Sequence, residues 1–178
     1  HLFSPSGLSH SGGAAFSFVP LALYVDSVKA DIDNMDLTIR ELTVADYETL
    51  TALWDRAGLP YKPKGRESRG RLGKEMSLPH CLALGLFDGD RLLGAGIANW
   101  DGRRGWINRL AVHPDYRGLG LAGRLLEPLE AFLKEQGALV ICALIEEENE
   151  PSMTCFEKAG YVCWPEVKYF SKRSSIDD

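Results

Sequence analysis

Residues 117–122 read Arg117-Gly118-Leu119-Gly120-Leu121-Ala122, between an apolar strand-like segment at 106–112 and an apolar helix-like segment at 120–136. A glycine-rich turn that leads into a helix presents several unpaired backbone N–H groups in one direction. Those donors and the positive end of the helix dipole suit a pyrophosphate group. The sequence therefore predicts an anion site where this strand passes into this helix.

The composition is that of an ordinary soluble globular protein. The 178 residues fit one domain with a sizeable core, and they are 45% hydrophobic and 25% charged with a net charge of −5. The mild acidity argues against nucleic-acid binding, and no apolar run is long enough to span a bilayer. The spacing of the four cysteines fits neither a paired zinc site nor a disulfide framework, which predicts free thiols in the reducing cytoplasm.

Apolar periodicity predicts an α/β domain with helices on both sides of a mixed sheet. Strands are expected at 37–41, 81–87, 91–98, 106–112, 139–145, 161–164 and 167–171. Helices are expected at 44–57, 67–76, 120–136 and 149–159. Asp88-Gly89-Asp90 is a strong hairpin signal, so the central strands form an antiparallel meander. The continuous apolar run at 139–145 is typical of a strand covered on both faces.

Residues 1–34 differ from the rest of the chain. Their first half is rich in Ser and Gly and has no helical or strand period, whereas Met35-Asp36-Leu37 reads like a native start that runs into the first strand. We interpret 1–34 as an N-terminal extension, either upstream or added sequence. Residues 35–178 are then the single folded domain.

A second motif lies on the C-terminal side of the glycine-rich turn. It comprises Asn149 and, further on, Phe156-Glu157-Lys158-Ala159-Gly160-Tyr161. Together with the run 110–122, this motif resembles the GNAT superfamily of N-acetyltransferases, whose pattern Arg/Gln-x-x-Gly-x-Gly/Ala is met here by Arg117, Gly120 and Ala122. The likeness covers 37–172. It implies a mostly antiparallel mixed sheet of six to seven strands flanked by about four helices.

Two other phosphate-binding motifs fit less well. A P-loop needs Gly-Lys-Ser/Thr, but Gly123 is followed by Arg124 and Leu125. The spacing of Gly118, Gly120 and Gly123 matches a dinucleotide fingerprint, but the preceding meander is antiparallel rather than part of a parallel unit.

The resemblance implies acetyl-CoA as co-substrate and no metal. The residues expected to bind it are Leu110, Ala111, Val112, Arg117, Gly118, Leu119, Gly120, Leu121, Ala122, Asn149, Ser152 and Phe156. The Val112 N–H is expected to hold the thioester carbonyl and its oxyanion. For Asn149 the competing interpretation is a plain helix N-cap. For Arg117 it is an ordinary surface residue with no ligand.

Strict alternation along 106–112 places Trp106, Asn108 and Leu110 on one face and Ile107, Arg109 and Ala111 on the other. In the family, a carboxylate on this strand often deprotonates the amine, but Asn108 and Arg109 are not bases at neutral pH. Glu146, in the acidic turn 146–148, is the preferred general base, and a solvated turn is the competing interpretation.

Phe156 occupies the position where many family members carry a tyrosine that protonates the leaving thiolate. Phenylalanine has no proton to donate, so water or Tyr169 is left for this role. A thiol with a pKa of ~8.5 leaves unassisted at neutral pH for a cost of about 2 kcal/mol.

The expected activity is acetyl transfer to a primary amine by direct attack in a ternary complex. The basic stretch 62–74 falls where the family walls its acceptor site, so the amine is expected to carry an anionic group unless the stretch is a solvated face. A homodimer is expected by resemblance. The alternatives are a catalytically impaired acyl-CoA-binding protein and an acetyltransferase of protein N-termini or lysines.

Overall fold

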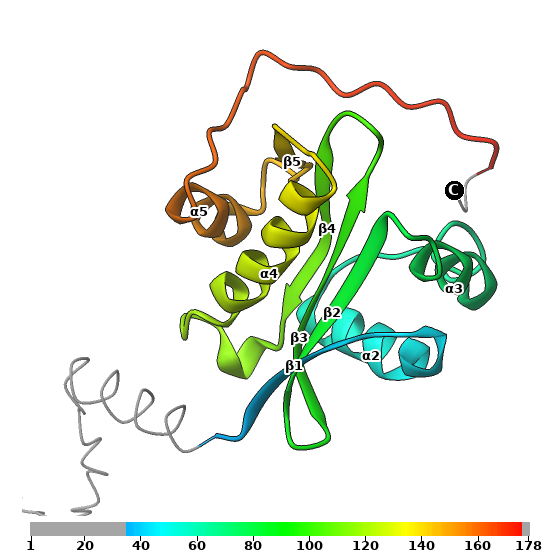
Figure 1. The fold of residues 1–178 in the computed structure, drawn as a ribbon, viewed down its shortest axis with the longest axis vertical. Coiled ribbons are helices and arrows are strands. Elements are labelled where there is room, and N and C mark those ends of the chain that lie inside the picture. The colour runs from blue at the N-terminus through cyan, green and yellow to red at the C-terminus, as the bar shows by residue number, and fades with distance from the viewer. Residues whose placement is uncertain (1–34, 176–178) are drawn as a thin grey trace, which may run out of the picture. The chain divides into compact units, whose positions relative to one another are not determined.

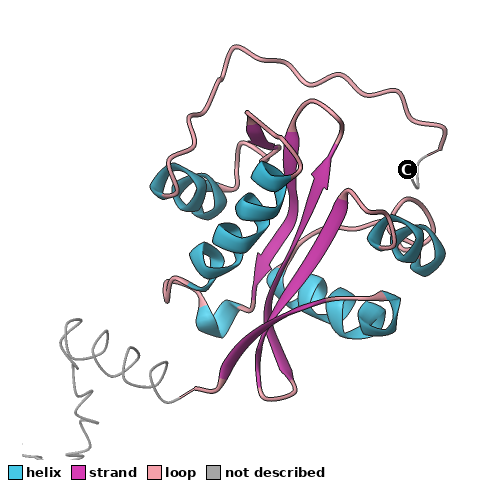
Figure 2. Ribbon diagram, viewed as in Figure 1, coloured by secondary structure: helices cyan, strands magenta, loops and turns pink. Residues whose placement is uncertain are grey.

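The computed structural model describes residues 35–175, which form one five-stranded sheet with helices on both faces (Figure 1; Figure 2). The strands are β1 (Leu37–Glu41), β2 (Cys81–Asp88), β3 (Arg91–Trp100), β4 (Gly105–Val112) and β5 (Ile141–Ala143). The helices are α2 (Tyr47–Ala57), α3 (Arg69–Met76), α4 (Leu121–Glu135) and α5 (Glu150–Lys158), with 3-10 turns η1 (Val44–Asp46) and η2 (Pro114–Tyr116). The expected α/β class and its four helices are confirmed.

The sheet follows the chain in the order β1-β2-β3-β4-β5. The first four strands pair antiparallel, and Asp88 pairs with Arg91 across the expected hairpin turn. β5 pairs parallel to β4, from Gly105 opposite Ile141 to Ile107 opposite Ala143. The sheet is therefore mixed and mostly antiparallel, as predicted.

The predicted count of six to seven strands is wrong for residues 35–175, which hold five. Residues 161–164 and 167–171 form no strand, and Figure 1 shows the chain after α5 running past the ends of β4 and β5 instead of along the sheet. The aromatic residues and valines of these segments favour extended backbone, but a strand also needs a neighbour for its hydrogen bonds. Trp164, Tyr169 and Phe170 are consequently exposed.

The expected burial of 139–145 is also wrong. β5 spans only three residues, and the flanking Leu139 and Leu144 are 96% and 60% exposed. Within the described range 35–175, no further strand covers the outer edge of β5, because 161–175 does not return to it.

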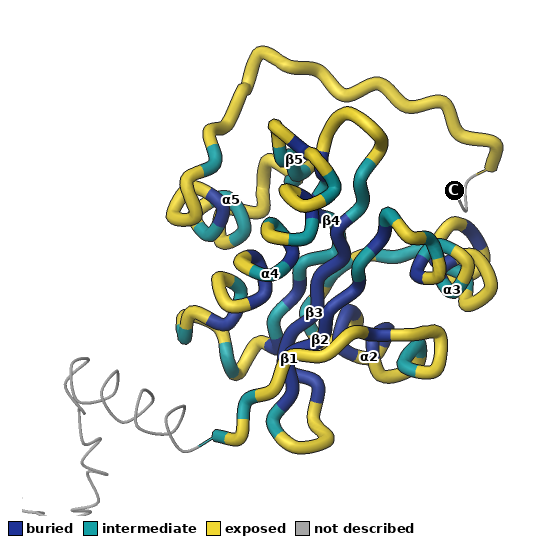
Figure 3. The backbone as a smooth tube through the Cα atoms, in the orientation of Figure 1, coloured by how far each residue is buried: buried dark blue, intermediate teal, exposed yellow. Residues whose placement is uncertain are grey.

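Two hydrophobic cores lie on opposite faces of the sheet, and Figure 3 shows the central strands as its most buried part. One core joins β2 and β3 to α2 and α3, with Trp54 and Leu50 fully buried. The other joins the sheet to α4 and α5.

α4 lies close against its face of the sheet because glycines leave room for its leucines. A Cβ added at each of these glycines would come within 3.0 Å of a leucine side chain of α4. The facing pairs are Gly94 with Leu125, Gly96 with Leu129, and Gly105 with Leu133. The leucines are spaced four residues apart on one helical stripe, which fixes α4 along the sheet.

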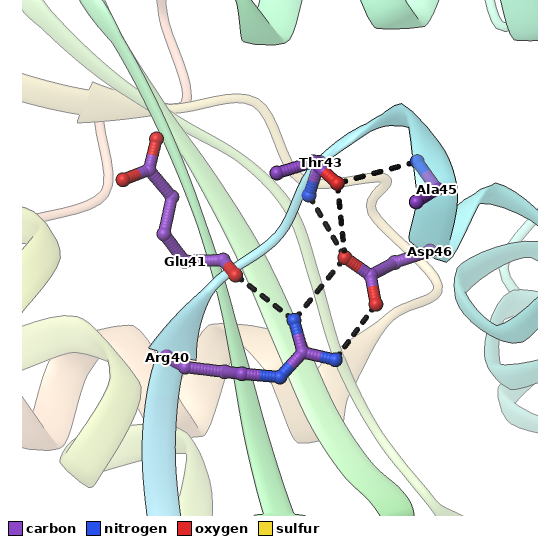
Figure 4. A network of polar contacts seen from close by, with 5 residues as sticks. All are labelled: Arg40, Glu41, Thr43, Ala45 and Asp46. Carbon is purple, nitrogen blue, oxygen red and sulfur yellow. Dashed lines mark hydrogen bonds and ion pairs between the residues drawn. The ribbon is translucent and has the colours of Figure 1, made fainter.

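A capping box of Thr43 and Asp46 begins the first helical segment, and Arg40 of β1 binds to it (Figure 4). The Thr43 hydroxyl accepts from the Ala45 N–H at 3.2 Å, and the Asp46 carboxylate accepts from the Thr43 N–H at 2.9 Å. Arg40 donates from both terminal nitrogens to Asp46, at 2.7 and 3.2 Å. The Arg40 guanidinium is the main cause that holds the pKa of Asp46 below its usual range.

Asp46→Ala should lower the free energy of unfolding by about 1 kcal/mol at pH 7, since it removes a cap and an ion pair. Because the folded-state pKa of Asp46 is lowered, its contribution is present at neutral pH and disappears as the pH falls through that pKa. Urea unfolding at pH 7 and pH 3 measures both effects, with the exposed neighbour Glu41→Ala as control. A deficit that is equal at both pH values would contradict the ionic part of this role.

Residues 1–34 lie outside the described residues, so their interpretation as an extension stays a prediction. All four cysteines fall inside the described part and are unpaired. Within 35–175 no helix has the length and apolar character to cross a membrane.

Candidate active site

The glycine-rich turn connects η2 to α4. His113 directly follows β4 and caps η2, with its Nδ1 accepting from the Asp115 N–H at 3.3 Å. Burial lowers the pKa of His113, which favours the neutral imidazole that this acceptor role needs. Gly118 and Gly120 both have φ of +78°, a left-handed conformation that costs glycine little, and Gly120 is the N-cap of α4.

The backbone of this turn has the free donors that an anion site needs. Among residues 35–175, the N–H groups of Gly118, Leu119 and Gly120 make no hydrogen bond. Leu121 and Ala122 form the first turn of α4, where N–H groups lack an intrahelical partner. The dipole of this 15-residue helix adds positive potential at the same place.

Arg117 follows η2, but its side chain contacts protein backbone. Its Nη2 donates to the Ala57 carbonyl at 2.7 Å and its Nε to the Val112 carbonyl at 3.3 Å. The guanidinium therefore joins the end of α2 to the end of β4. A guanidinium has five N–H donors, so others are left, and its phosphate contact stays a prediction.

Among residues 35–175, nothing pairs with the outer edge of β4 beyond Ile107, where the pairing with β5 stops. The His113 N–H donates to Leu93 across the β3–β4 ladder. Because antiparallel pairs alternate between bonded and non-bonded, the N–H of the preceding Val112 is turned away from β3, toward the unpaired edge. Leu110, Ala111 and Val112 thus offer a strand edge to an extended ligand.

A β-bulge interrupts β4 inside this edge. The register with β3 shifts between Ala95 and Ile97, so that Gly96 faces two residues, Arg109 and Leu110. Arg109 has φ of +54°, the one positive φ at a non-glycine position in 35–175. Such a conformation costs about 1–3 kcal/mol and persists where the surroundings enforce it.

The bulge overturns the alternation predicted for this strand. Ile107 and Leu110 both pack in the core beneath α4, although strict alternation places them on opposite faces. Asn108 and Arg109 instead both project toward α2 and α3: Arg109 lies over the Trp54 ring, and Asn108 bonds to a side chain that is held by α3. Two consecutive polar side chains on one face are a consequence of the extra residue.

Arg109 is held by a buried ion pair with Glu67, in the loop between α2 and α3. Glu67 also accepts from the Lys62 N–H at 2.8 Å and from Arg66 Nε at 2.7 Å. Arg109 Nη1 donates to the Pro60 carbonyl at 2.5 Å. The α2–α3 loop is therefore fastened to the bulge by one carboxylate and one guanidinium. Beside it, residues 54, 55 and 58–61 line a hollow of about 300 Å³.

The basic stretch 62–74 is partly neutralised by ion pairs. Arg66 pairs with Glu67, and the exposed Arg69 pairs with Glu48 on α2. Glu67 was visible in the sequence as an acid within this stretch, but only the fold brings it to Arg109.

The loop after β5 carries the predicted residues of the second motif. Asn149 caps α5, with its Oδ1 accepting from the Ser152 N–H at 3.2 Å, which matches the plain N-cap interpretation. Glu146 is exposed in this loop, and its role as base stays a prediction.

Phe156 lies in the core rather than at an open surface. It is 5% exposed and meets the Tyr161 ring edge-on, with ring centroids 4.9 Å apart. The Tyr161 hydroxyl donates to Glu130 at 3.0 Å, and burial, followed by Glu130, raises the pKa of this phenol. Tyr169 is exposed on the C-terminal segment.

Two residues that sequence reasoning missed lie on the same face as Asn108. Asn99 on β3 and Glu75 on α3 form a hydrogen-bonded chain with it. No local pattern marks them, because the contact spans three elements. Arg109 carries no sequence signal for its left-handed backbone either.

The comparisons with known proteins agree with this geometry. The family model described as Acetyltransferase (GNAT) family matches residues 39–161. An acetyltransferase of Pectobacterium atrosepticum is 29% identical over 127 residues, covering 70% of this chain and 87% of its own. An acetyltransferase of Sodalis glossinidius is 29% identical over 139 residues, which cover 77% of this chain and 95% of its own.

Solved structures share the fold at low identity. An aminoglycoside acetyltransferase from an uncultured soil metagenomic sample, in complex with sisomicin, has a TM-score of 0.67 at 16% identity and covers 81% of this chain and 99% of its own. The PaiA N-acetyltransferase of Thermoplasma acidophilum, in complex with coenzyme A, has a TM-score of 0.62 at 22% identity, covering 70% and 89%. With the family model matched across sheet, turn and second motif, the chain belongs to the GNAT family of acetyltransferases and is an N-acetyltransferase.

Proposed function

We propose that this enzyme transfers the acetyl group of acetyl-CoA to a primary amine of a small molecule, by direct attack in a ternary complex. One observation carries the proposal: the unpaired edge of β4 leads into a turn whose N–H groups are free. The turn suits the pyrophosphate of coenzyme A, and the strand edge suits its extended pantetheine arm. The PaiA relative in complex with coenzyme A supports this choice of co-substrate.

The chemistry follows from these positions. The amine nitrogen attacks the thioester carbon, and the Val112 N–H stabilises the oxygen that becomes negative. Such a preorganised donor contributes about 3 kcal/mol in acyl transfer. The carbon–sulfur bond then breaks, the thiolate takes a proton from water, and the nitrogen gives its extra proton to the hydroxide that this water leaves. Since Phe156 is buried and has no proton to donate, we propose departure of the thiolate without a protein acid.

A thiol-release assay tests the proposal. We expect free coenzyme A to accumulate from acetyl-CoA only when an amine is present, with sisomicin, spermidine, lysine and glucosamine 6-phosphate as probes. Lysine and glucosamine 6-phosphate carry an anionic group, whereas sisomicin and spermidine do not. Faster release of coenzyme A with the first pair would support the anionic acceptor predicted from 62–74. Tight acetyl-CoA binding without turnover of any amine would contradict the proposal. Turnover of lysine-containing peptides alone would favour a protein-modifying enzyme.

A further inference from the structure

A chain of three polar side chains crosses the face of the sheet beside the bulge. Asn108 Nδ2 on β4 donates to Asn99 Oδ1 on β3 at 3.0 Å. Asn99 Nδ2 donates in turn to Glu75 Oε1 on α3 at 2.9 Å. All three residues are half-buried.

The carboxylate at one end sets the direction of the whole chain. An ionised carboxylate only accepts hydrogen bonds, so Asn99 must turn its NH₂ group toward Glu75. The Asn99 oxygen then faces Asn108, which must donate in its turn. The amide orientation of Asn108 is therefore fixed by its partners, with its Oδ1 left over.

This oxygen is an acceptor without a partner. Among residues 35–175, no group donates to Asn108 Oδ1, and the fully buried unpartnered side-chain atoms are on Trp54 and Trp100 instead. Asn108 directly follows Ile107, the last residue of β4 that pairs with β5. The free acceptor thus lies where the open edge of β4 begins, four residues before the Val112 N–H.

We propose that Asn108 Oδ1 accepts a hydrogen bond from the attacking amine and that Glu75, through Asn99, is the positioning residue that turns this oxygen toward it. The inference rests on the proposed acetyl transfer to an amine. The ion pair with Glu67, which also binds Arg66, weakens the repulsion between the neighbouring Arg109 and an amine. A carboxylate in this place would favour the protonated form of the amine, which cannot attack. The uncharged amide oxygen orients the nitrogen without this charge effect.

The test reverses the donor-to-acceptor direction of the hydrogen bonds from Asn108 through Asn99 to Glu75. It uses the probe amine with the highest wild-type turnover. Asn108→Leu keeps the size but loses the acceptor, so kcat/KM for the amine should fall at least tenfold while KM for acetyl-CoA stays unchanged. In Asn108→Asp alone, the Asn99 oxygen faces a carboxylate, so two acceptors meet and the hydrogen bond between these side chains is lost. In the double variant Glu75→Gln/Asn108→Asp, the new amide on α3 donates to Asn99, and Asn99 donates to the new carboxylate on β4. The chain is thereby restored in the opposite direction.

We expect the double variant to recover most of the kcat/KM lost in Asn108→Asp, with its pH profile shifted to higher pH because the new carboxylate stabilises the ammonium form. Unchanged kcat/KM in Asn108→Leu would overturn the inference. A double variant whose loss equals the combined losses of Asn108→Asp and of Glu75→Gln, each measured alone, would overturn it too. A purely structural role of the chain predicts no pH shift. Melting temperatures with and without acetyl-CoA verify that each variant folds. If the wild type turns over no amine, the proposed function fails instead.

Discussion

Acetyl-CoA should raise the melting temperature of the wild-type chain by roughly 5–10 °C at a hundredfold excess over its Kd, and should not raise that of Gly120→Glu. The substituted residue would place a carboxylate at the N-cap of α4, among the free N–H groups of 118–120. It would repel the pyrophosphate and occupy its place. Differential scanning fluorimetry with increasing acetyl-CoA measures the effect.

Gly137→Glu is the matched control for this experiment. Gly137 follows α4 and has φ of +96°. At both Gly137 and Gly120, a Cβ atom added to the glycine would have no neighbour among the described residues within 4 Å. Both substitutions therefore carry a similar backbone cost, but only one lies at the helix N-terminus. A preserved shift in Gly120→Glu, or its loss in both variants, would mean that the anion site is elsewhere.

Glu67→Gln should lower the free energy of unfolding by about 3–5 kcal/mol. The substitution leaves the charge of Arg109 without its partner in a place where that side chain is 15% exposed. It also releases the tie that holds Arg109 at positive φ, since Glu67 fastens the α2–α3 loop to the bulge. Urea unfolding measures the loss, and amine turnover should fall with it because Asn108 directly precedes the bulge residues Arg109 and Leu110.

The exposed pair of Glu48 and Arg69 provides the control. Glu48→Gln makes the same chemical change in a carboxylate whose side chain is 71% exposed, and solvent screens such pairs, so stability should stay near that of the wild type. The double variant Glu67→Gln/Arg109→Gln should recover part of the loss by removing the unpaired charge. Equal stabilities of Glu67→Gln and Glu48→Gln would show that the buried pair does not hold the loop.

Local signals in the sequence predicted most of the domain. The Asp-Gly pair located the hairpin between β2 and β3, and apolar periodicity located α2 and α4 to within a few residues. The boundary residues Asn149 and Gly160 located α5. The glycine-rich turn was recognisable because its conformation depends on glycine at 118 and 120. Each of these features is decided by residues close together in the chain.

Features that depend on distant partners could not be predicted in this way. The apolar residues within 161–171 favour extended backbone but do not say whether another strand will pair with it. The left-handed Arg109 is compensated by Glu67, 42 residues away, and no local pattern encodes that compensation. The bulge moved Asn108 and Arg109 to one face, so the acceptor side of the site follows from tertiary contacts.

The crystal structure of the chain with coenzyme A tests the central claim most directly. We expect the pyrophosphate on the N–H groups of 118–122 and the pantetheine arm along the unpaired edge of β4, with its sulfur near the Val112 N–H. A coenzyme whose pyrophosphate lies away from this turn, or whose arm leaves the edge of β4, would contradict it.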